Sequence, residues 1–349
     1  MIYPPLTAFP LYWENGMKLS ADHFQHLENS IEDGIRDSRA IGLTANQGFG
    51  LLPYSPFSLQ NAQGINPQAV RVVLNACRAI LPGGYRVEIL PDNVQQLKIP
   101  AKMPFVEFVP VPGVRYHLFL SVHESKRIPT GEPQIRPIRY PYLAPDYRLE
   151  HLPHEKLSAA QRLAPNRMKI AEWQDGKIIE GYIPPVLIIK GYPILEKIYD
   201  NLQVQLENLV RIGTQVINEY RNRDVSRVTF CLPIVQYIRG SQGYFKWVLP
   251  NQSPLYLAGY YGDLVGLVEG LIETCDRDFV RNQLKEGQIN NLRQSVHDLM
   301  KFRTIPLEEM AIILMLIQKF GEALILTLKH LLSTKAPDIK QGDRNISSG

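Results

Sequence analysis

The period of the apolar residues changes once along this chain, at Pro193, and this change constrains the fold more than any other feature. Before Pro193, short runs alternate between apolar and polar residues and are interrupted by Pro and Gly, which is typical of strands. After it, the segment 194–223 contains no Pro and repeats apolar residues every three or four positions, which predicts a long helix. The pattern therefore predicts an α+β chain, with strands first and helices second.

The strand signals are strongest at two places. Val70–Ala76 and Tyr85–Ile89 alternate on either side of a Pro-Gly-Gly turn, and Asp175-Gly176 separates two further short apolar runs, so each region predicts a hairpin. Val114–Val122 alternates as another strand. The proline-rich stretch 136–142 is expected to be extended, either as a surface loop or as an arm over a neighbouring subunit. We expect residues 1–192 to form an antiparallel β-sandwich.

Two apolar seams run along the predicted helices of the second half. Gln205 interrupts the first seam, and Gly321 lies in the second, within a helix that begins near Pro306. Because such seams exceed what one copy is expected to cover, we expect a helical bundle over residues 193–332 that several copies share. Residues 333–349 are polar and are expected to form a disordered tail. The predicted seam residues are Leu195, Ile198, Leu202, Leu209, Val216, Leu314, Ile317, Leu324 and Leu328.

The stretch Leu11–Gln25 combines aromatic residues, a turn and a helix start. Asn15-Gly16 predicts the turn, because Gly adopts positive φ without steric cost, and Ser20 is a good N-cap. The helix that follows has one apolar face, which we expect to be buried, and one polar face, which we expect to be wet. The apolar face comprises Phe24, Leu27, Ile31 and Ile35, and the polar face Gln25, Glu28, Glu32 and Arg36.

Composition excludes several classes of function. The formal net charge of +4 is small for 349 residues, and no basic run is interleaved with aromatics, so we expect no nucleic-acid partner. Three widely spaced cysteines favour reduced thiols in the cytoplasm. No signal peptide is visible, and charged residues interrupt the apolar stretch Leu307–Leu332, so we expect a soluble helix there.

No catalytic or cofactor motif stands out. The pairs His23/His26 and His151/His154 have metal-ligand spacing, but no third ligand accompanies either, so packing roles are the better interpretation. No nucleophile elbow or phosphate-binding loop is present. We therefore expect no catalytic residue, metal, cofactor or small-molecule substrate.

Short motifs along the chain resemble those of the TssK family, the baseplate subunit of bacterial type VI secretion systems. Ile183-Pro184-Pro185 resembles a family Ile-Pro-Pro signature, and Pro254-Leu255-Tyr256 with Ala258-Gly259 resembles positions at the end of the family's neck region. The opening motif comprises Trp13, Gly16, Met17, Leu19, His23, Phe24 and Gln25.

The resemblance implies a structural, non-catalytic adaptor. It implies a homotrimer with a β-sandwich shoulder similar to that of phage receptor-binding proteins, followed by a helical neck. The implied partners are the wedge proteins TssF and TssG and a membrane-complex or other anchor protein, at a cytoplasmic site peripheral to the inner membrane. The separate C-terminal head of longer members is expected to be missing or replaced.

Two questions stay open at this point. The opening motif, of which Trp13, Gly16, Met17, His23, Phe24 and Gln25 are the candidate wedge contacts, serves either packing within the chain or binding to the wedge. The alternative function is a receptor- or glycan-binding module of a phage-like contractile injection particle, since the shoulder fold would be shared.

Overall fold

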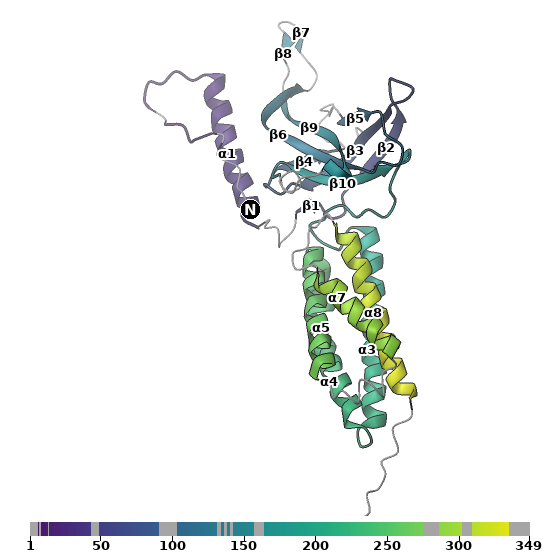
Figure 1. Cartoon of the computed structure of the whole chain (residues 1–349). Helices are drawn as coiled ribbons and strands as arrows, with labels where there is room; N and C mark the ends of the chain where they lie inside the picture. Colours follow the sequence, from purple (N-terminus) through teal and green to yellow (C-terminus); the bar gives the residue numbers. More distant parts are fainter. Residues whose placement is uncertain are drawn as a thin grey trace, which may run out of the picture. The chain divides into compact units, whose positions relative to one another are not determined.

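The chain has an α+β fold, here described from a computed structural model (Figure 1). Contacts divide it into two compact units. The first comprises Met1–Ile198, Trp247–Ala258 and Thr304–Ile313, and the second comprises Tyr199–Lys246, Gly259–Arg303 and Leu314–Gly349. The structure describes all residues except 1–5, 7, 13, 43–48, 91–102, 131–133, 136–137, 140–141, 157–163, 275–285, 302–308 and 335–349.

The first sheet is built around β3 (Val70–Ile80). This long strand pairs antiparallel with four others, and its pairing with β4 confirms the first predicted hairpin. Alternate residues of β3, including Val72 and Leu74, are fully buried, as expected for a strand with one face in the core. The partners are β1 (Gly50–Leu51), β2 (Ser58–Gln63), β4 (Arg86–Ile89) and β5 (Phe105–Phe108).

The second sheet has the antiparallel order β11-β10-β6-β9. Asp175 and Gly176 both have positive φ, 48° and 90°, in the turn between β10 and β11, which confirms the second predicted hairpin. Val186 forms a single isolated bridge to Leu51 of β1. The bounds are β6 (Tyr116–Thr130), β9 (Tyr142–Pro153), β10 (Arg167–Gln174) and β11 (Lys177–Ile178), with the short pair β7 (Gln134–Ile135) and β8 (Ile138–Arg139) beside them.

The long helix predicted after Pro193 is confirmed as α3, and α4 accommodates Pro233 within it. Asp224 caps α4, accepting from Arg227 N at 3.2 Å. Helix α5 is continuous through Gly259, Gly262, Gly266 and Gly270. The helices are α1 (Ala21–Gly42), α3 (Pro193–Tyr220), α4 (Val225–Gly240), α5 (Pro254–Thr274), α7 (Glu286–Met300) and α8 (Met310–Ser333).

Helix α8 is the one helix in the described ranges long and apolar enough to cross a membrane, by length and composition alone. One face, including Ile317, Leu324 and Leu328, is fully buried against the rest of the chain. The opposite face exposes Lys319 and Glu322. Helix α8 is therefore amphipathic in the fold, with one face packed into the chain and the other exposed.

Helices α3 and α8 approach each other closely at Gln205 and Gly321. The Gln205 side chain donates from Nε2 to the Gln318 carbonyl at 3.0 Å. A Cβ added to Gly321 would overlap the Gln205 amide, so an alanine there would force that side chain to move. The two residues that interrupt the apolar seams therefore meet, and together they fix the register of the two helices.

We expect Gly321→Ala to lower the free energy of unfolding by about 1–2 kcal/mol, because the buried Gln205 amide must shift and lose its bond. Gly266→Ala on α5 is the matched control: its added Cβ meets nothing within 4 Å, so the better helix propensity of alanine should stabilise by about 0.5–1 kcal/mol. Chemical unfolding followed by circular dichroism measures both. Equal effects of the two substitutions would contradict the role given to the contact between Gln205 and Gly321. Adding Gln205→Ala to Gly321→Ala should restore part of the lost free energy of unfolding.

Candidate interaction surface

The opening motif shapes the chain's entry into α1. Gly16 has φ 86° in a turn closed by Met17 N donating to Glu14 O at 3.2 Å, which confirms the predicted turn. Ser20 then precedes the helix, and its backbone N–H donates to Nδ1 of His23 at 3.1 Å. His23 is the third residue of α1, so it accepts from the N-cap backbone as Glu does in a capping box. Gly16 and His23 thus have local structural roles.

The expectation for helix α1 holds only in part. Gln25, Glu28 and Glu32 are exposed as predicted, but Arg36 is 5% exposed, as is Asp33. Phe24, Ile31 and Ile35, on the apolar face, are 51%, 53% and 44% exposed. The predictions that the apolar face is buried and that Arg36 is solvated are therefore wrong for the single chain. Polar contacts around Asp33 and Arg36 bury these two residues instead.

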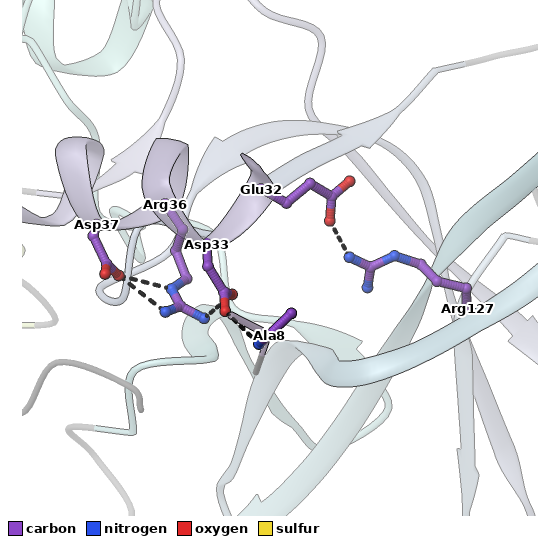
Figure 2. A network of polar contacts seen from close by, with 6 residues as sticks. All are labelled: Ala8, Glu32, Asp33, Arg36, Asp37 and Arg127. Atoms are coloured by element: carbon purple, nitrogen blue, oxygen red, sulfur yellow. Dashed lines mark hydrogen bonds and ion pairs between the residues drawn. The ribbon is translucent and has the colours of Figure 1, made fainter. Parts of the chain in front are cut away.

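Figure 2 shows this set of polar contacts. Arg36 bridges two carboxylates, donating to Asp33 Oδ1 at 2.8 Å and to Asp37 Oδ1 at 2.9 Å. The second oxygen of Asp33 accepts from Ala8 N at 3.1 Å, and Glu32 pairs with Arg127 of β6. The contacts to Ala8 and Arg127 connect α1 to other segments, while Phe24, Ile31 and Ile35 of its apolar face are exposed.

Electrostatics stabilise the charged form of Arg36. Burial alone would lower the pKa of this guanidinium, but the hydrogen bond to Asp37 and the charges around it raise the pKa overall. The guanidinium also lies over the ring of Tyr85, 5.6 Å from its centroid. Arg36 therefore remains a fixed cation that holds the segment before α1 and the helix together.

Large apolar side chains are exposed throughout this N-terminal region. Outside α1, Tyr12 is 81% exposed and Phe9 69% exposed. Exposed apolar side chains gathered in one short region mark an interaction site more often than scattered ones do. We call this set the N-terminal apolar surface; it comprises Leu6, Phe9, Tyr12, Leu19, Phe24, Ile31 and Ile35.

The motif residues divide between the two roles left open by the sequence. Gly16 and His23 form the turn and the helix start, while Phe24 and Gln25 are exposed. Met17 is half-buried. Trp13 lies outside the described residues. Leu19 and Phe24 are thus the motif residues that belong to the N-terminal apolar surface.

The Ile-Pro-Pro motif packs against the edge of the first sheet. Ile183 is 3% exposed and both prolines are buried. The Pro185 carbonyl accepts from Leu51 N at 2.9 Å, and Leu187 N donates to Leu51 O at 3.1 Å. Gly50, with φ 137°, leaves no room for a Cβ beside the Pro185 backbone. This motif therefore joins the segment before α3 to β1.

The predicted seam lies in the interior of the single chain. Ile198 is half-buried, and the other eight residues are at most 2% exposed. The helices also pack closely against one another. A Cβ added to Gly213 of α3, for example, would lie 2.6 Å from the side chain of Val235 of α4. The seam therefore packs within one chain. That several copies of the chain share this seam remains a prediction. The eight are Leu195, Leu202, Leu209, Val216, Leu314, Ile317, Leu324 and Leu328.

Sequence reasoning missed the charged residues that orient α1. Asp33 and Arg36 are spaced i, i+3, which allows a pair on a helix surface. That signal is weak, because most such pairs are solvated, and the contact with Arg127 joins residues 95 positions apart. Among the described residues, no group of three or more His, Cys, Asp or Glu side chains has the arrangement needed to hold a metal ion.

Comparison with known proteins gives similarities at the level of structure. No family model and no curated protein matches the sequence. A crystal structure of TssK superposes with a TM-score of 0.54 at 17% identity, covering 94% of this chain and 70% of that one.

Two further solved structures are similar. They are TssK in the type VI secretion TssK-TssF-TssG baseplate subcomplex (TM-score 0.48, 14% identity, 94% of this chain and 100% of that one) and TssK from the type VI system of EAEC bound to a nanobody (TM-score 0.47, 14% identity, 85% and 66%). The similarity to the TssK crystal structure extends over nearly the whole chain. The chain therefore resembles TssK in its fold as well as in its short motifs. This chain has the fold of TssK.

Proposed function

We propose that this chain is a TssK-type adaptor of a type VI secretion baseplate. In this role it is non-catalytic, binds wedge proteins of the TssF and TssG type through a β-sandwich shoulder, and forms a homotrimer through a helical-bundle neck. It links the wedge to a membrane anchor from the cytoplasmic side. The observation that carries the proposal is the TssK fold over 94% of the chain, supported by the order of the TssK-like motifs along the sequence.

The N-terminal apolar surface is the part of the molecule best suited to bind the wedge. The contacts of Asp33 with Ala8 and of Glu32 with Arg127 connect α1 to other segments, with Phe24, Ile31 and Ile35 exposed. A helix that presents apolar residues at this spacing fits an apolar groove on a partner. At 1.5 Å per residue, the stripe from Phe24 to Ile35 is about 17 Å long. A contact of this size contributes to an interface as one part of a larger docking face.

We expect Ile31→Glu to weaken binding to the TssF and TssG proteins from the same gene cluster by about tenfold or more, about 1.4 kcal/mol. The reason is that a carboxylate in a desolvated apolar contact loses its hydration without gaining a partner. The measurement is biolayer interferometry with the full chain immobilised and the co-expressed TssF–TssG pair in solution.

Ile65→Glu is the control for this substitution. Ile65 is 89% exposed in the turn between β2 and β3, away from α1 in sequence, so its substitution should change affinity less than twofold. A wild-type chain that does not bind TssF–TssG would contradict the proposed function. Binding that is equal for wild type and Ile31→Glu would leave the function standing and remove α1 from the interface.

A homotrimer would use the outer faces of the helices, because the seam is buried within one chain. Exposed apolar residues remain on these faces: Leu326 of α8 and Val204 of α3 are each 56% exposed. On α8 they alternate with charged residues such as Lys319 and Glu322, a mixture that suits a wet interface between copies. The exposed apolar residues on the two helices are Ile194, Val204, Ile312, Met315 and Leu326.

A further inference from the structure

The chain has an Asn or Asp directly before a Gly at three places: Asn15-Gly16, Asp33-Gly34 and Asp175-Gly176. Such pairs are chemically labile, because the backbone nitrogen of the second residue can attack the side-chain carbonyl carbon of the first. Glycine has no Cβ to hinder this close approach of the backbone. The surroundings of each pair therefore decide whether it reacts in the folded chain.

The structure restrains the two Asp-Gly pairs. Asp33 is 5% exposed inside α1, and its carboxylate accepts from Ala8 N and from Arg36. Asp175 lies in the turn between the paired strands β10 and β11, and its Oδ1 accepts from Gly113 N at 3.2 Å. Both side chains are thus held away from the following nitrogen. An ionised carboxylate, the ordinary form of Asp at neutral pH, is also a poor electrophile.

The Asn15-Gly16 pair lacks these restraints. Both residues are exposed, and the Asn15 side chain makes no hydrogen bond to any residue that the structure describes. The bond that closes their turn uses the N–H of Met17, which donates to Glu14 O, so the N–H of Gly16 is not part of it. A Cβ added to Gly16 would meet nothing within 4 Å, so the space around this residue is open.

The reaction that this pair can undergo needs only water. The deprotonated backbone nitrogen of Gly16 attacks Cγ of Asn15, a C–N bond forms, and the side-chain nitrogen leaves as ammonia, which gives a succinimide ring. Water then adds to one of the two ring carbonyl carbons and breaks its bond to the nitrogen. Opening at Cγ leaves aspartate in place of Asn15, and opening at the backbone carbonyl carbon leaves isoaspartate. No oxidant, reductant or cofactor takes part.

We propose that Asn15-Gly16 is a site of spontaneous deamidation in the folded chain, with aspartate and isoaspartate as products. Each product adds a carboxylate between Tyr12 and Leu19 of the N-terminal apolar surface. Isoaspartate also adds one carbon atom to the main chain of the turn, so the bond from Met17 N to Glu14 O cannot keep its geometry. The modification therefore changes the segment that leads into α1 as the protein ages.

Peptide mass spectrometry of the full chain tests the proposal. The folded protein is kept at 37 °C and pH 8.5, sampled over days, and digested at acidic pH to stop the reaction. The peptide with Asn15 should gain about 1 Da as an amide becomes a carboxylate. Chromatography should separate two products, one of which is methylated by an isoaspartyl methyltransferase. The rate should fall at lower pH, because the deprotonated nitrogen is the nucleophile.

Asn29 is the internal reference for the rate. It precedes Ser30 inside α1, where the backbone N–H of Ser30 is a helix donor and must first be released. This opening should make Asn29 react at least about tenfold more slowly than Asn15. Equal rates at Asn15 and Asn29 would overturn the proposal, as would isoaspartate that forms at Asp33 or Asp175 before it forms at Asn15.

Asn15→Gln is the matched control variant. Its longer side chain would need a larger ring, which closes more slowly, so the mass gain of this peptide should disappear. The mass gains of all other peptides should stay as they are in the wild type. A mass gain that persists in the Asn15→Gln peptide would place the reaction at another residue and overturn the assignment.

Discussion

Replacing Arg227 with methionine is expected to lower the free energy of unfolding by about 3–5 kcal/mol, because it leaves buried acceptors without their cation. Arg227 is 0% exposed. Its guanidinium pairs with Asp224 at 2.9 Å and donates to the carbonyls of Leu331 and Thr334 at 2.5 and 2.7 Å. The last carbonyls of a helix have no partner within the helix. Arg227 of α4 therefore supplies hydrogen-bond donors to carbonyls at the C-terminal end of α8.

Tyr220 of α3 also contacts the C-terminal end of α8. Its hydroxyl donates to Thr334 O at 2.9 Å, and its ring lies 4.1 Å from the guanidinium carbon of Arg227. Arg239→Met is the matched control, since Arg239 lies on the same helix and is exposed; a change below about 0.5 kcal/mol is expected. Guanidinium unfolding followed by circular dichroism at 222 nm measures both variants. A loss below about 1 kcal/mol for Arg227→Met would contradict the role given to this residue.

Gly50→Ala should destabilise the first unit by about 3 kcal/mol or more. Gly50 has φ 137°, a conformation that costs other residues about 1–3 kcal/mol. The added Cβ would also overlap the backbone of Pro185 and Val186, which is held by the bond from Leu51 N. The backbone must move, and the junction between β1 and the Ile-Pro-Pro segment is expected to open.

Gly113→Ala separates the two causes. Gly113 also has positive φ, 77°, but nothing lies within 4 Å of its added Cβ, so only the conformational cost of about 1–2 kcal/mol applies. Thermal unfolding followed by near-ultraviolet circular dichroism compares the two variants. At roughly 2–4 °C per kcal/mol, Gly50→Ala should unfold several degrees below Gly113→Ala. Equal midpoints would show that the contact with Pro185 adds nothing.

Much of the fold was predictable from short-range patterns. Alternation along β3 and the Asp175-Gly176 turn predicted paired strands that the structure confirms. The Pro-free repeat after Pro193 predicted α3 with close to its observed ends. These signals are local, since strand alternation and helical spacing act within one element, and they are strongest where one face packs into a core.

The orientation of α1 could not be predicted in the same way. A helical pattern shows that apolar residues share a face, but it does not show what covers that face. Here the contacts of Asp33 with Ala8 and of Glu32 with Arg127 connect α1 to other segments, and Phe24 and Ile31 are exposed. Arg127 is far from Glu32 in sequence, so no local pattern reports the pair.

Buried charges and glycine contacts were missed for a related reason. Lys169 and Glu172 are residue types that are ordinarily exposed, yet both are 5% exposed because each satisfies the other. Gly321 lies in the predicted second seam, and only the structure shows that Gln205 occupies the space of the missing side chain. Both cases depend on pairs of residues whose proximity the fold creates.

Native mass spectrometry of this chain co-expressed with wedge proteins of the TssF and TssG type tests the central claim most directly. The account predicts complexes that contain TssF, TssG and copies of this chain in multiples of three. Free single chains beside a TssF–TssG complex that lacks them would contradict it.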